Sequence, residues 1–150
     1  MPYVEQSILI NAPIDAVFRI VAHQPERMAS WWPPIELQRR VTPPPTSLGS
    51  ISRYVYNMIG VRIKGEHKVI DYVENQHLLV RTTSGIDASF DFTFEPNDDT
   101  TRLTIRVDYT LPGAILGQLL NREVLEKKNI DDLQQGLRNL KSLVEKEATV

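Results

Sequence analysis

The spacing of apolar residues alternates along the chain between strand-like and helical patterns. Residues 3–10 are rich in β-branched and aliphatic side chains and predict a first strand, which Asn11-Ala12-Pro13 ends. Apolar residues at helical spacing then predict a short amphipathic helix over 13–22, and a second short helix follows over 24–31. Because the residue before a proline is disfavoured in a helix, Trp32-Pro33-Pro34 ends the second helix.

From residue 35 onward the pattern is mostly that of strands. Residues 35–42 predict an edge strand, and Pro43-Pro44-Pro45 predicts a loop because proline cannot donate a hydrogen bond to a neighbouring strand. Short turn-forming segments then separate five further predicted strands: 50–58, 62–72, 77–83, 86–95 and 101–110. Such short connections favour an antiparallel meander, because parallel strands need long crossovers.

The last part of the chain predicts a long helix over about 114–147, after Leu111-Pro112-Gly113 ends the sheet. One apolar stripe runs along this helix, at steps of three and four: Ile130, Leu133, Leu137, Leu140 and Val144. We find no internal repeat and no linker, so residues 1–150 predict a single domain. The element order, a strand, two short helices, six strands and a long helix, is typical of an α+β fold with helices on one face of an antiparallel sheet.

Strict alternation assigns one face of the predicted sheet to the interior. The inner residues are mostly apolar and carry a few polar tips: Tyr54, Tyr56, His67, Thr82 and Tyr109. An apolar pocket with a few convergent polar groups is typical of a small-molecule site. The same residues also fit a filled core in which tyrosine hydroxyls reach the rim, so the pattern leaves both interpretations open.

Composition narrows the class of protein. The 150 residues suffice for a hydrophobic core, and the absence of cysteine excludes disulfides and thiolate metal sites and suits a reducing compartment. The net charge of −2 provides no basic excess for nucleic acid or for an anionic membrane. No apolar run approaches the ~20 residues of a membrane helix, and the N-terminus does not resemble a signal peptide. We therefore expect a cytoplasmic protein with no nucleic-acid partner and no integral membrane segment.

Few residues are candidates for chemistry. No histidine or carboxylate pair has the spacing of metal ligands, and no phosphate loop or nucleophile elbow is present, so we expect no metal and no cofactor. His67 is the one inward group that ordinarily titrates near neutral pH, and it is either a polar anchor for a ligand or a histidine that hydrogen-bonds a tyrosine in the cavity wall. Trp31 and Trp32 are either a gate at the cavity end or a packing plug.

Several segments resemble a known superfamily. They are "SILINAPIDAVFRIV", "WWPPI", the strand that Gly49 opens, and "TRLTIRVDYTLPG" before a long helix. Together they resemble the START/Bet v1-like (SRPBCC) superfamily, and most closely its polyketide cyclase/dehydrase and lipid-transport branch, which includes coenzyme Q-binding members. The resemblance implies a helix-grip fold, in which a seven-stranded antiparallel sheet curves around the C-terminal helix and encloses a cavity for lipids, quinones, sterols or polyketides.

The resemblance also implies which residues face a ligand. On the strands these are Tyr54, Tyr56, Ile63, His67, Leu78, Val80, Phe90, Phe92, Ile105, Val107 and Tyr109. Phe18, Trp31 and Trp32 would lie near the end that the short helices close. Leu116, Leu119 and Leu120 would lie near the entrance.

Three functions are compatible with this sequence. The apolar inner face favours binding or transport of a small hydrophobic molecule by a non-catalytic carrier or sensor. The alternative is an enzyme of the cyclase or dehydrase type acting on a polyketide, with His67 and the inward tyrosines as acid-base and oxyanion groups. The third is a protein-interaction module that docks a partner on the sheet or on the long helix.

Overall fold

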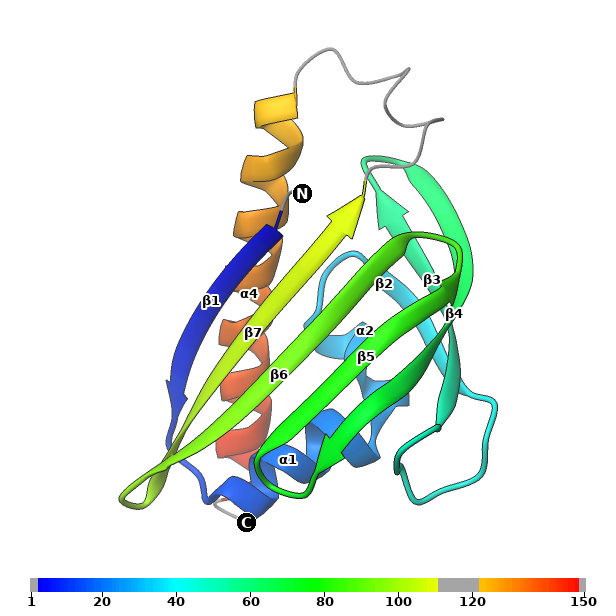
Figure 1. Ribbon diagram of the computed structural model, residues 1–150. Coiled ribbons are helices and arrows are strands. Elements are labelled where there is room, and N and C mark those ends of the chain that lie inside the picture. The colour runs from blue at the N-terminus through cyan, green and yellow to red at the C-terminus, as the bar shows by residue number, and fades with distance from the viewer. Residues whose placement is uncertain (1–2, 111–121, 149–150) are drawn as a thin grey trace.

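The computed structural model describes residues 3–110 and 122–148, which form one antiparallel sheet with helices against one face (Figure 1). The strands are β1 (Tyr3–Ile10), β2 (Ile35–Arg40), β3 (Ile51–Met58), β4 (Val61–Val73), β5 (His77–Ser84), β6 (Asp87–Asn97) and β7 (Thr100–Thr110). The helical elements are α1 (Ile14–His23), the 3-10 turn η1 (Pro25–Arg27), α2 (Met28–Trp31) and α4 (Arg122–Ala148).

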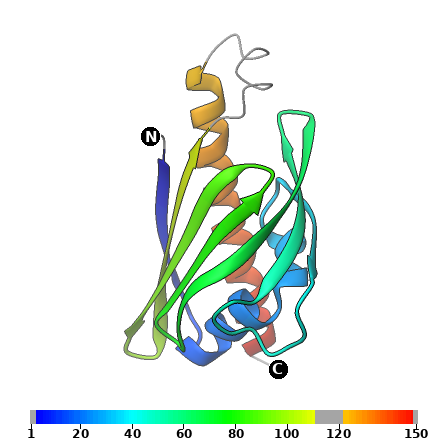
Figure 2. The same ribbon diagram turned by 45° about the vertical axis from the view of Figure 1, so that its right-hand side comes forward.

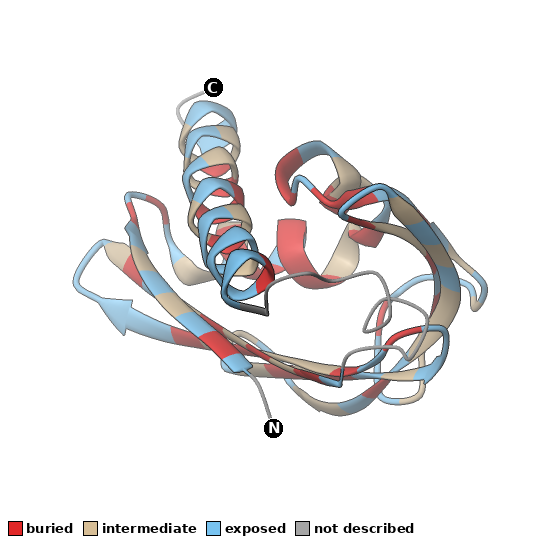
Figure 3. Cartoon of the chain, turned by 90° about the horizontal axis from the view of Figure 1, so that it is seen from above, coloured by how far each residue is buried: buried red, intermediate tan, exposed pale blue. Residues whose placement is uncertain are grey.

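The sheet has seven strands in the order β1-β7-β6-β5-β4-β3-β2. From β2 to β7 each strand pairs antiparallel with the next strand in sequence, and β1 closes the sheet by pairing with β7. Seen from above, the sheet curls around α4 and the short helices, and the buried residues lie on the surfaces that face one another (Figure 3). The predicted helix-grip α+β fold is confirmed.

Most predicted elements agree with the structure to within one or two residues at either end. The second short helix differs, because the predicted segment 24–31 is divided into η1 and α2. The Met28 N–H bonds the carbonyl of Pro25, three residues earlier, which is the tighter 3-10 pattern. Residues 114–121 of the predicted long helix lie outside the described residues.

The buried stripe of α4 differs from the prediction at one position. Leu133, Leu137, Leu140 and Val144 are buried as expected, but Ile130 is 37% exposed. Leu125, five residues earlier, is instead 1% exposed. The prediction for Ile130 was wrong, since its side chain lies at the margin of the buried face and reaches solvent.

The C-terminal half of α4 is tied to β1 and to the short helices. Lys141 Nζ donates to the carbonyl of Leu9 over 2.9 Å. Asn139 Nδ2 donates to the carbonyl of Trp31 over 3.1 Å. Gly136 lies against Trp31 and its neighbours, so α4 approaches this segment closely. These contacts hold the helix along β1, and β2 at the opposite edge of the sheet lies next to η1 and α2 (Figure 2).

Candidate functional site

A cavity, here called cavity 1, lies between strands β2–β6 and the segment from α1 to α2. Its volume is about 50 Å³. The helical segment contributes Val21, Ala22, Pro25 and Met28. The sheet and the loop before β3 contribute Ile35, Gln38, Arg40, Thr46, Ser50, Ile51, Ser52, Tyr54, Tyr56, His67, Val69, Leu78, Val80, Phe90 and Phe92.

Strand pairing arranges the inward side chains of the sheet, many of which line cavity 1, in rows. Directly paired residues form an apolar row across β4, β5, β6 and β7: Val69, Val80, Phe90 and Val107. A second row, here called the polar rung, runs across β2, β3, β4 and β5: Arg40, Ser52, His67 and Thr82. Paired residues on one face have Cβ atoms roughly 4.5–5.5 Å apart, so the polar rung brings four hydrogen-bonding side chains together.

A β-bulge in the edge strand β2 decides which of its residues face the cavity. Ile35 pairs with Tyr56, whereas Leu37 pairs with Val55, so the register shifts between them. Strict alternation from Ile35 would turn Leu37 inward, but Leu37 is 44% exposed and Gln38 is 4% exposed. The extra residue therefore directs the Gln38 and Arg40 side chains into cavity 1.

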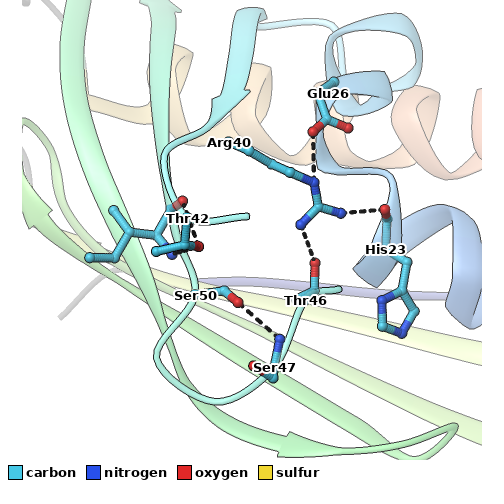
Figure 4. Close-up of polar contacts among 8 residues, drawn as sticks. His23, Glu26, Arg40, Thr42, Thr46, Ser47 and Ser50 are labelled. Atoms are coloured by element: carbon cyan, nitrogen blue, oxygen red, sulfur yellow. Dashed lines mark hydrogen bonds and ion pairs between the residues drawn. The ribbon is translucent and has the colours of Figure 1, made fainter. Parts of the chain in front are cut away.

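Arg40 links three parts of the chain beside cavity 1 (Figure 4). Its Nε lies 2.9 Å from Glu26 Oε1, and its Nη1 donates to Thr46 Oγ1 over 2.9 Å. Its Nη2 donates to the carbonyl of His23 at the end of α1. The guanidinium thus joins the loop between β2 and β3 to the turn between α1 and η1, and Glu26 balances its charge.

His67 lies in the wall of cavity 1 with its ring stacked on Tyr54. The ring centroids are 5.7 Å apart and the planes differ by 13°. Nδ1 is buried and has no hydrogen-bond partner among the described residues, so this nitrogen does not make the hydrogen bond to a tyrosine that was one of the two interpretations. Burial lowers the pKa of His67 to about 4, and the imidazole is therefore neutral at pH 7.

The Tyr54 hydroxyl has a structural role, because protein groups already occupy it as a donor and as an acceptor. Its hydroxyl donates to the carbonyl of Ser84 over 2.9 Å and accepts the N–H of Ile86 over 3.0 Å, so it ties β3 to the turn after β5. Burial raises its pKa, although the Ile86 hydrogen bond opposes the shift. Gly65 makes this reach possible, because a Cβ there would lie 2.5 Å from the Tyr54 hydroxyl oxygen.

A smaller cavity of about 30 Å³, here called cavity 2, lies between the sheet and α4. It is lined by residues that include Trp32, Tyr109 and Asn129. Tyr56 and Phe90 line both cavities and therefore form the partition between them. Burial raises the pKa of Tyr56, and it also raises that of Tyr109 against the effect of a hydrogen bond with Asn129.

Another histidine, His77, lies between two aspartates on the outer face of the sheet. His77 Nδ1 lies 2.5 Å from Asp71 Oδ2, and Nε2 lies 2.7 Å from Asp91 Oδ1. Burial alone would lower the pKa of His77, but the hydrogen bonds to the two aspartates outweigh it and raise the pKa. Within residues 3–110 and 122–148, no three His, Cys, Asp or Glu side chains are grouped as ligands of a metal ion.

The sequence profile of the family "Polyketide cyclase / dehydrase and lipid transport" matches residues 1–145. The chain belongs to this family. Membership in the polyketide cyclase/dehydrase and lipid-transport family supports, in general terms, either hydrophobic-ligand binding or cyclase activity. No protein of curated function has a sequence that matches this member of the family.

Solved structures show the same fold at low sequence identity. The protein TTHA0849 from Thermus thermophilus is 20% identical, with a TM-score of 0.80 over 95% of this chain and 97% of that one. A START superfamily protein from Mycobacterium smegmatis is 18% identical, with a TM-score of 0.71 over 96% and 97%. The Zhui aromatase/cyclase from Streptomyces sp. R1128 is 14% identical, with a TM-score of 0.71 over 96% and 93%. The expected relation of this family member to START/Bet v1-like proteins is confirmed.

The residues predicted to face a ligand fall into four groups in this family member. Cavity 1 is lined by Tyr54, Tyr56, His67, Leu78, Val80, Phe90 and Phe92. Cavity 2 adds Trp32, Val107 and Tyr109. Neither cavity is lined by Phe18, Trp31, Ile63 or Ile105. Leu116, Leu119 and Leu120 lie outside the described residues.

The two tryptophans, which the sequence could not distinguish, have different surroundings. Trp31 is 1% exposed, and its indole N–H has no partner within the described parts of the chain. It stacks on Trp32 with ring centroids 5.7 Å apart. Trp32 in turn meets the edge of Phe90, with the centroids 5.6 Å apart, at cavity 2. Trp31 therefore packs in the core, and Trp32 contributes to the cavity wall.

Sequence reasoning missed the polar residues that β2 and the following loop bring to cavity 1. These are Gln38, Arg40 and Thr46. The alternation of β2 does not reveal Gln38 and Arg40, because the bulge exchanges the inward and outward positions after it. Thr46 lies in a loop, where side chains do not alternate between two faces. Ser52 lies two residues before Tyr54 and by alternation shares its face, but nothing in the sequence distinguishes it as a site residue.

No helix in the described part of the chain is long and apolar enough to cross a membrane.

Proposed function

We propose that this protein binds a small, mainly apolar molecule in cavity 1 and acts as a carrier or sensor without transforming it. The observation that carries this proposal is the position of cavity 1 between the sheet and the short helices, with apolar side chains from both layers in its wall. Burying apolar surface contributes about 25 cal/mol per Å², so a ligand that buries roughly 200 Å² would gain about 5 kcal/mol.

The size of the site indicates how a ligand would enter it. Typical ligand pockets have volumes of about 300–1,000 Å³. Cavity 1 and cavity 2, at about 50 and 30 Å³, are much smaller. Displacing Tyr56 and Phe90, the two residues of the partition, joins the cavities into one space that runs from the short helices to α4. We expect the ligand to bind by this displacement.

The protonation states of the inward groups favour binding over acid-base catalysis. A general acid or base works best with a pKa near the working pH. Burial takes the pKa of His67 down to about 4 and raises those of Tyr56 and Tyr109. Among the described residues, the only hydrogen bond between two side chains that line cavity 1 joins Arg40 and Thr46. The groups proposed for a cyclase therefore lack a proton-transfer partner.

The test is native mass spectrometry of the purified protein, followed by organic extraction and by a thermal-shift screen against lipids, quinones and polyketides. We expect a retained or stabilising apolar molecule whose structure is unchanged after release. Val80→Phe should fill cavity 1 and abolish the effect, whereas Val73→Phe, the same change at a 41% exposed position, should not. A molecule released in cyclised or dehydrated form would contradict the carrier function, and no response from any compound would contradict binding.

A further inference from the structure

We propose that Gln38, Ser52 and His67 form a subsite that hydrogen-bonds a neutral carbonyl or hydroxyl oxygen of the ligand. The inference rests on the proposed function and adds the chemical class of the ligand. It assigns to cavity 1 a compound with an apolar body and an uncharged oxygen at one end.

The first observation is that Gln38 and Ser52 are buried residues, that Nδ1 of His67 is a buried atom, and that none of these groups has a hydrogen-bond partner among the described residues. Gln38 is 4% exposed and Ser52 is 7% exposed. Neither side chain makes a hydrogen bond to any described residue, and the same is true of the buried Nδ1 of His67. All three residues line cavity 1. A buried polar atom without a partner is destabilising, so a ligand group that pairs with Nδ1 of His67 is bound favourably. The polar atoms of Gln38 and Ser52 have no protein partner among the described residues and are free to pair with the same ligand.

The second observation is that strand pairing brings the three groups together. Ser52 is paired directly with His67, so their side chains are neighbours on the inner face. Gln38 is paired with Tyr54, two residues along β3 from Ser52, and therefore lies diagonal to Ser52. Diagonal neighbours are within reach of long side chains. One ligand oxygen at this place can accept from the Gln38 amide and from the Ser52 hydroxyl.

The charge balance of the site favours a neutral oxygen over a carboxylate or phosphate. Among the described residues of the wall, the one cation is Arg40, which is already paired with Glu26 and bonded to Thr46 and to the carbonyl of His23. Burial lowers the pKa of His67 and keeps its imidazole uncharged at pH 7. The remaining groups are an amide, a hydroxyl and a neutral imidazole, which hydrogen-bond without compensating a charge.

The fourth member of the polar rung provides an internal control. Thr82 Oγ1 donates to the carbonyl of Ala88 over 3.1 Å and accepts the N–H of Ala88 over 2.9 Å. Its hydroxyl is therefore occupied by β6 and is not offered to a ligand. Thr82→Val removes a hydroxyl from the same row without removing a group of the proposed subsite.

The experiment compares three probes that have equal numbers of non-hydrogen atoms: acetophenone, isopropylbenzene and benzoate. Their dissociation constants are measured by NMR chemical-shift titration of the full chain. The variants are Gln38→Leu, Ser52→Ala and His67→Phe, with Thr82→Val as control. Each of the three variants should weaken acetophenone relative to isopropylbenzene by about 2- to 10-fold, the effect of one lost hydrogen bond, and Thr82→Val should leave the ratio unchanged. Ser52→Ala is the smallest change and serves where a larger one prevents folding.

The outcomes separate this inference from the proposed function. If both neutral probes bind and the variants change their affinities equally, cavity 1 binds apolar molecules but the subsite does not exist. If benzoate binds more tightly than acetophenone, the site recognises an anion and the inference is wrong. If none of the probes binds to the unaltered chain and the lipid, quinone and polyketide screen also gives no response, the proposed function itself fails.

Discussion

Replacing Gly65 with alanine should destabilise the protein strongly, because the Tyr54 side chain crosses β4 at this position. A Cβ at residue 65 would lie 2.3 Å from the carbonyl oxygen of Ser84 and 2.5 Å from the hydroxyl oxygen of Tyr54. Both contacts are far shorter than van der Waals distances, so the tyrosine and the local backbone must move apart. The two hydrogen bonds of the Tyr54 hydroxyl are then lost.

The magnitude follows from these contacts. Overpacking a well-filled region costs about 1–3 kcal/mol. Each lost hydrogen bond costs about 0.5–1.5 kcal/mol, so the two bonds together account for about 1–3 kcal/mol. We therefore expect Gly65→Ala to lower the free energy of unfolding by about 2–6 kcal/mol, which is a large part of the total stability of a typical domain, about 5–15 kcal/mol.

The assay is urea denaturation followed by circular dichroism, with Gly136→Ala as the matched control. A Cβ at residue 136 would meet its nearest atoms at 3.4–3.6 Å, in ordinary contact. Alanine is also favoured over glycine inside a helix by about 1 kcal/mol, so this variant should be as stable as the original or more so. A loss of less than about 1 kcal/mol for Gly65→Ala, or an equal loss in both variants, would refute the reasoning.

Three further predictions test other parts of the site. Arg40→Met should lower the free energy of unfolding by about 1–3 kcal/mol, because the guanidinium bonds to Glu26, Thr46 and the carbonyl of His23 are lost. The variant should also accelerate proteolysis of the segment between β2 and β3. The control Arg39→Met, on the exposed side of β2, should have neither effect. The raised pKa of His77 contributes stability that is fully present below its unfolded value of 6.5 and is lost as the pH rises through the folded value. The urea midpoint should therefore fall above pH 6.5 in the original chain and fall less in His77→Gln, and equal curves would contradict this. Phe90→Ala should join the two cavities and increase the fluorescence of 8-anilinonaphthalene-1-sulfonate, an anionic dye whose aromatic rings bind apolar cavities. Phe94 lines neither cavity, so Phe94→Ala should lower stability by about 3–5 kcal/mol without this increase.

The fold could be predicted because most of the strands keep strict alternation. In β7, Leu103, Ile105 and Val107 are all buried, and every residue between them carries a polar side chain. Short turns between such strands leave little choice other than an antiparallel meander. The long apolar stripe of α4 then has only the concave face of the sheet to cover.

The cavity wall could be predicted less well, because bulges depend on how two strands pair. The bulge in β2 turns Gln38 and Arg40 inward. In β4, a register shift between Val69 and Asp71 likewise turns Tyr72 inward, where its hydroxyl hydrogen-bonds His23 Nε2 over 2.9 Å. The sequence of a single strand contains no signal for the position of such an extra residue.

The choice between a filled core and an open cavity also lay beyond the sequence. Tyr56 and Phe90 were predicted to face inward, and they do. Whether such side chains fill a space or divide it depends on the packing of Trp32, which comes from a different element. Packing of this kind involves residues far apart in the chain and has no local pattern.

The β2 bulge has a consequence for how proteins with this fold can diverge. Deleting one residue between Ile35 and Gln38 would remove the bulge, and strict alternation from Ile35 would then still direct Gln38 and Arg40 into the cavity. Because β2 is an edge strand, the rest of the sheet would keep its pairing. The polar wall can thus outlast the bulge through the loss of a single codon, whereas strict alternation in a strand of unchanged length would turn Leu37 inward and Gln38 and Arg40 outward.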